Sequence, residues 1–173
     1  MKHIKLKLGF GAVLLILSSF FQFNAAPVRG TVHGMTAAEL RKLRQLPGKP
    51  VIPGMIPAGY AFKRMDVVLK PTASYLLEYR CFCSGQNYMI SVMGGTIIKP
   101  AKAIKWESVP VKALNTQVKI GQFAAGQGIP SAYYLTEWLG KSPLKIAILS
   151  AAQGKRAPYA DFVKFVKHLE YMK

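Results

Sequence analysis

The sequence predicts an α+β fold in which a single antiparallel sheet of about six strands is covered by a C-terminal helix and preceded by a short N-terminal helix. Short runs rich in β-branched and aromatic residues recur through the middle of the chain, between turn residues. Several connections between these runs are short enough for hairpins. Helix signals occur at the two ends of this region and not between the strands, which favours α+β over alternating β–α–β units.

The first 26 residues are typical of a bacterial signal peptide. Three lysines precede an apolar run over residues 8–21, which is shorter than the roughly 20 residues that cross a bilayer as a helix. Ala25 and Ala26 suit a signal peptidase, whereas Pro27 directly after them does not. We therefore expect an extracytoplasmic protein, periplasmic or secreted, with an uncleaved and membrane-tethered form as the alternative.

A strong positive charge characterises the chain. Residues 1–26 carry three of its 24 basic side chains and none of its seven acidic ones, so the remaining 147 residues have a net charge of +14. A length of 147 residues suits one domain with a single core. Such an excess attracts polyanions. Export excludes nucleic acid as the natural partner and favours anionic lipids, lipopolysaccharide phosphates, wall polymers or an acidic protein. The alternative is a basic surface that only maintains solubility.

A helix is predicted to begin after Thr36 and to run to Leu46. The Thr36 hydroxyl and the Glu39 carboxylate have the spacing of a capping box, and Met35 can pack on Leu40 as a hydrophobic staple. Basic residues interleave with the leucines and form either an anion-binding face or a solvated one. These candidate anion-binding residues are Arg41, Lys42 and Arg44.

Residues 27–56 are expected to precede the globular domain, which is assigned to 57–173. We expect residues 27–34, including His33, to form a flexible arm. Three prolines between residues 49 and 57 predict an extended linker, because proline lacks the backbone donor that regular pairing needs.

Six strands are expected in the globular domain, with a further strand around 106–112. A closing helix is predicted from Pro158 to Leu169, with an apolar stripe that includes Phe162 and Phe165. The six expected strands are Tyr60–Leu69, Ser74–Phe82, Tyr88–Met93, Val118–Ala124, Tyr133–Leu139 and Lys145–Ser150.

No catalytic, cofactor-binding or metal-binding constellation emerges from the sequence. After the signal segment the only histidines are His33 and His168, and the latter is expected on the helix surface. The seven carboxylates are scattered among predicted strands and helices. We therefore expect a protein that is not an enzyme and that uses no cofactor.

The cysteines Cys81 and Cys83 stand two residues apart at the end of a predicted strand. Their Cα atoms are expected to lie about 6.6 Å apart, near the upper limit for a disulfide. Four states are open: free thiols, a local disulfide, an intermolecular bond, or redox or metal chemistry. Arg80 would favour the thiolate form if it lies nearby.

Several short segments, taken in order, resemble a known family. They are Pro57-Ala58-Gly59-Tyr60, Tyr75–Tyr79, Val118–Gly121, Leu135–Trp138, Leu144–Ile148 and Asp161–Leu169. The order is similar to that of a domain of unknown function in the outward-facing part of bacterial anti-sigma-factor-like and sporulation membrane proteins. In this pattern Tyr60 and Trp138 are expected to anchor a core between sheet and helix.

The resemblance implies an extracytoplasmic sensing or binding module without catalytic residues. Together with the charge, it predicts a binding module of the cell envelope with a basic surface for an anionic partner. The alternative is an accessory subunit that docks on another envelope protein through the N-terminal arm and the helix at 37–46.

Overall fold

A computed structural model describes residues 33–95, 102–125, 132–139, 144–150 and 156–173. The predicted signal peptide, residues 1–26, lies outside these residues. Among the residues described, the structure contains no helix with the length and apolar character that a membrane span requires.

The main element is an antiparallel sheet, which confirms the α+β class. It has seven strands within the described residues rather than about six, because the stretch near residue 106 also joins it. In spatial order they are β2 (Ala61–Val68), β3 (Ser74–Cys83), β4 (Gln86–Gly94), β8 (Ile146–Ser150), β7 (Tyr133–Thr136), β6 (Thr116–Phe123) and β5 (Lys105–Val111). Each expected strand therefore exists, with ends that differ from the expected ones by at most three residues.

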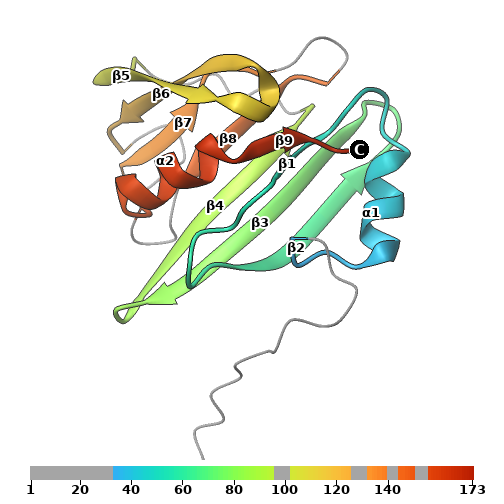
Figure 1. Cartoon of the computed structure of the whole chain (residues 1–173), viewed down its shortest axis with the longest axis horizontal. Helices are drawn as coiled ribbons and strands as arrows, with labels where there is room; N and C mark the ends of the chain where they lie inside the picture. The colour runs from blue at the N-terminus through green and yellow to red at the C-terminus, as the bar shows by residue number, and fades with distance from the viewer. Residues whose placement is uncertain (1–32, 96–101, 126–131, 140–143, 151–155) are drawn as a thin grey trace, which may run out of the picture.

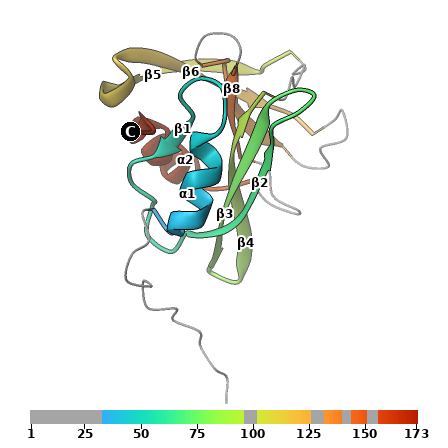
Figure 2. The same ribbon diagram turned by 90° about the vertical axis from the view of Figure 1, so that its right-hand side faces the viewer.

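The sheet curls so that one face is concave. Figures 1 and 2 show β5 and β6 bending over at one end of the sheet. Both helices lie on the concave side that this bend creates. The helices are α1 (Ala37–Arg44) and α2 (Tyr159–Lys167). The helix α2 packs on the concave face through buried phenylalanines: the Phe165 ring lies 5.3 Å from that of Tyr79, and Phe162 lies 5.5 Å from Tyr134. A C-terminal helix therefore covers the sheet, as predicted, but it ends at Lys167, and Leu169, the predicted last residue, begins a strand instead.

A two-stranded ribbon lies on this same side and was not predicted. Its strands are β1 (Val51–Pro53) and β9 (Leu169–Tyr171), which pair antiparallel. The prolines around β1 do not prevent pairing, because in a two-stranded ribbon one side of each strand forms no hydrogen bonds with another strand. On the open side the Tyr75 hydroxyl accepts from Val51 N at 3.0 Å and donates to Val51 O at 2.9 Å. The linker prediction for residues 49–57 is therefore wrong.

The boundary expected at residue 57 is also wrong, because the preceding residues belong to the same core. Met35, Leu43 and Val51 are all completely buried. The capping box is confirmed: Glu39 N donates to the Thr36 hydroxyl and Thr36 N donates to the Glu39 carboxylate. The helix α1 ends at Arg44, two residues before the predicted end.

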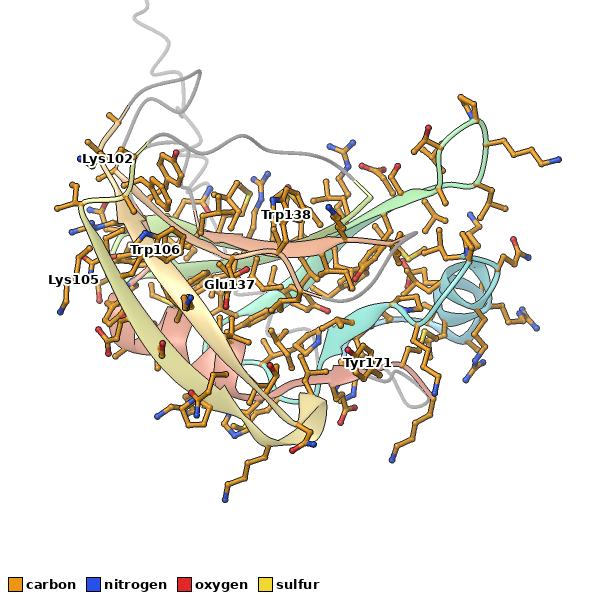
Figure 3. The ribbon with its side chains drawn as sticks, turned by 90° about the horizontal axis from the view of Figure 1, so that it is seen from above. Lys102, Lys105, Trp106, Glu137, Trp138 and Tyr171 are labelled. Carbon is orange, nitrogen blue, oxygen red and sulfur yellow. A yellow bond between two sulfur atoms is a disulfide. The ribbon has the colours of Figure 1, made fainter. Side chains whose placement is uncertain are left out.

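A second, smaller apolar cluster lies on the convex face of the sheet. Phe123 and Tyr133 stack there with ring centroids 4.9 Å apart, and Trp106 meets Phe123 edge-on. Gly121 pairs with Trp106 and leaves room for these rings. Trp138 packs on this cluster and not on the helix-covered core, so its expected place was wrong (Figure 3). Tyr60 is buried in the main core, as expected.

Candidate anion-binding pocket

The three basic residues predicted from the helix pattern lie on the exposed face of α1. Arg41, Lys42 and Arg44 are all exposed, and none of them forms an ion pair with another residue that the structure describes. The leucines of this helix, Leu40 and Leu43, are buried in the core. The exposed side of α1 is therefore mainly polar and basic, and the exposed apolar residues of the helix are the small Ala37 and Ala38.

A pocket of about 480 Å³ lies elsewhere, where the two strands of the ribbon meet the ends of α2 and of the short 3₁₀ helix η1 (Lys112–Leu114). This 3₁₀ helix connects β5 to β6 and contacts β9. The connection therefore lies beside the C-terminal strand. The residues that line the pocket are Gly54, Pro110, Lys112, Ala113, Lys167, His168 and Glu170.

Two lysines give this pocket its positive side, and a histidine lies beside them. Lys112 and Lys167 come from different elements, and neither is ion-paired with a described residue. His168 caps the C-terminus of α2, and its Nδ1 lies 2.7 Å from the Lys164 carbonyl oxygen. A carbonyl oxygen only accepts, so Nδ1 carries the proton. The Nε2 atom is then the ring nitrogen that remains for a ligand.

Glu170 provides the one carboxylate of the pocket lining. Its Oε1 lies 3.6 Å from Nε2 of His33, so His33 lies against the fold and not in a flexible arm as expected. Residue 54 has no room for a side chain, because a Cβ there would lie 2.9 Å from the His168 carbonyl oxygen and 3.0 Å from Glu170 Oε2. A glycine at this position therefore preserves the space in front of the carboxylate.

The balance of charges decides which ligands the pocket favours. Lys112 and Lys167 contribute two positive charges, and Glu170 contributes one negative charge. The C-terminus of α2 adds a partial charge of about −0.5. The sum of these charges is weakly positive, which favours an anionic ligand over a cationic one.

A second pocket of about 440 Å³ adjoins the first. It shares Pro110 and Lys112 with the first pocket, and it adds Asn115, Thr116 and Gln117. These three side chains are exposed and offer neutral hydrogen-bonding groups. Asn115 has a φ of 49°, a left-handed conformation that Asn tolerates better than most residues. Together the two pockets combine a half lined by two lysines with a half lined by neutral polar side chains.

The sequence did not indicate this site, since its residues are far apart in the chain. His168 was expected on the helix surface, where it does lie exposed. Lys112 falls in a stretch for which only a strand was expected. A signal could have come from Lys167 and His168, because basic residues gather at the end of the helix.

Metal ligands do not cluster in the part of the chain that the structure describes: no three His, Cys, Asp or Glu residues there could hold an ion. The chain was also compared with models of protein families, with curated proteins and with solved structures, and none of them matched. The resemblance to the extracytoplasmic domain family therefore stays a prediction.

Proposed function

We propose that this chain is an exported, non-enzymatic binding module of the bacterial cell envelope that holds an anionic saccharide unit of an envelope polymer. The observation that carries the proposal is the convergence of Lys112 and Lys167 on one pocket without ion-pair partners among the described residues. Charges of this kind are free to bind a carboxylate or phosphate. The net charge of the chain attracts such a polymer from a distance.

The remaining polar groups support a saccharide over a small inorganic anion. Glu170 can accept hydrogen bonds from hydroxyl groups, and Asn115, Thr116 and Gln117 offer both donors and acceptors in the adjoining pocket. A lone phosphate would use the lysines and leave these groups in water. A sugar with one acidic group uses both halves.

Titration of the chain with an oligomer of four uronic-acid residues tests the proposal. The double variant Lys112→Gln and Lys167→Gln should bind at least about tenfold more weakly, which corresponds to about 1.4 kcal/mol. The matched control is Lys42→Gln and Arg44→Gln, which removes the same charge from α1. We expect less than about a twofold loss there.

Two further conditions sharpen this experiment. A neutral tetrasaccharide should bind much more weakly than the acidic one, and high salt should weaken acidic binding. Equal losses in the pocket and α1 double variants would instead indicate a diffuse basic surface and would refute the pocket.

A further inference from the structure

The disulfide between Cys81 and Cys83 lies at the tip of the β3–β4 hairpin. Their Cα atoms are 5.5 Å apart, closer than the spacing expected for an extended strand. Figure 1 shows this tip projecting beyond the rest of the sheet. Ser84 and Gly85 form the connection, both with positive φ, 52° and 69°, as a tight type I′ turn requires.

The disulfide adds little that the hairpin does not already provide. Cys81 pairs with Tyr88 and Cys83 with Gln86 in an unbroken ladder that runs from Tyr75 to the turn. The stabilisation expected from a crosslink grows with the length of the loop it closes, and here the loop contains a single intervening residue. A purely structural role therefore explains this bond poorly.

The two sulfur atoms differ in accessibility. Cys81 is 1 % exposed, whereas Cys83 is partly exposed at the tip. Gly59 lies against both sulfurs, since a Cβ there would be 2.9 Å from Cys83 Sγ and 3.1 Å from Cys81 Sγ. One side of the bond is thus covered by backbone, and Cys83 is the sulfur that an external thiolate reaches.

An exposed aromatic residue stands between the two cysteines. Phe82 is 79 % exposed, more than any other large hydrophobic residue in the described part of the chain. It lies on the opposite face of the strand, together with Arg80, whose Nε donates to Glu78 Oε1 at 2.6 Å. The expected effect of Arg80 on the thiolate is therefore weak, because its charge is neutralised on the other face. Phe82 offers an apolar contact for a protein that reaches the tip.

We propose that Cys81–Cys83 is a redox-active disulfide that exchanges with a dithiol of a partner protein docking at Phe82. A partner thiolate attacks Cys83 Sγ, the bond between the cysteines breaks, and Cys81 leaves as a thiolate. The second partner thiolate then attacks the partner's own sulfur and releases Cys83. Two electrons pass to the cysteine pair, the partner becomes a disulfide, and the released thiolates take up protons from water.

Counting alkylated thiols by intact mass tests the exchange on the full chain. Dithiothreitol should open the bond without denaturant, so that two thiols are alkylated while the chain stays folded by circular dichroism. Alkylation only after unfolding in urea would show a structural disulfide and overturn the proposal. Two alkylated thiols in protein that was oxidised and not reduced would do the same, because no bond would be present.

Single variants test the direction of attack and the docking residue. The thiol of Cys81→Ser should react with an aromatic disulfide reagent at least about tenfold faster than that of Cys83→Ser, and equal rates contradict the proposed order. Phe82→Ser should exchange with dithiothreitol at the normal rate and with reduced thioredoxin, a probe dithiol protein, at least about fivefold more slowly. Equal slowing with both reagents, or slowing with neither, overturns docking at Phe82.

Discussion

Two tyrosines on strand β3 provide a matched pair of substitutions that tests how the ribbon is held. Tyr75 and Tyr79 both point into the main core and are almost completely buried. The Tyr75 hydroxyl forms two hydrogen bonds with the backbone of Val51, whereas the Tyr79 hydroxyl is buried and has no hydrogen-bond partner among the residues that the structure describes. Replacement by phenylalanine removes one oxygen atom in each case, with opposite consequences.

The magnitude follows from the groups that lose their partner. In Tyr75→Phe two hydrogen bonds are lost, each worth about 1 kcal/mol, and the buried N–H and C=O of Val51 are left unsatisfied at a further cost. We expect a loss of about 3 kcal/mol in the free energy of unfolding, or on the order of 10 °C in Tm. Tyr79→Phe removes an unpartnered polar atom, and we expect a gain of about 1 kcal/mol.

Urea unfolding monitored by circular dichroism measures both changes. The proposed binding pocket provides a second readout, because β1 leads directly to Gly54 in its lining. Binding of the acidic oligosaccharide should weaken in Tyr75→Phe and stay unchanged in Tyr79→Phe. Equal stabilities for the two variants would refute the assignment of the Tyr75 hydroxyl to the ribbon.

Two further predictions concern the rest of the fold. Partial burial raises the pKa of Tyr159 to about 12, and burial also raises the pKa values of the core residues Tyr60, Tyr75 and Tyr79. The unfolded chain therefore releases these protons first, from about pH 10 upward. The urea midpoint should accordingly fall as the pH rises above about 10. A midpoint that rises there instead would show that relief of lysine repulsion dominates. Gly121→Ala would place a Cβ 2.5 Å from the Phe123 ring. We expect this substitution to lower the free energy of unfolding by about 1–3 kcal/mol in urea titrations and to change the fluorescence of Trp106. Unchanged stability would mean that the rings of the convex cluster can move aside without cost.

The features predicted correctly from the sequence depend on neighbouring residues. The capping box needs only Thr36 and Glu39, which are three residues apart, and the hairpin turn needs only Ser84 and Gly85. Alternating runs and short apolar runs are also local patterns, so the six expected strands and the further one around 106–112 could be located in the sequence, including β7 and β8, which are buried at almost every residue. The features predicted wrongly depend on partners that are distant in the chain. The strand β1 has three residues, too few for any periodicity, and its prolines indicate a linker unless the other strand is known.

The sequence by itself determined the antiparallel α+β class, the helix starts and the positive charge of this chain, because propensity, capping and charge are properties of short segments. Only the tertiary structure decided which of the basic residues stay in water and which line a pocket. The basic helix α1 keeps Arg41, Lys42 and Arg44 in water, whereas pairing of β1 with β9 brings the end of α2 beside η1. Lys112 and Lys167 then line one pocket. Burial of apolar surface drives this closure, and the polar residues that it brings together carry no local signature of it.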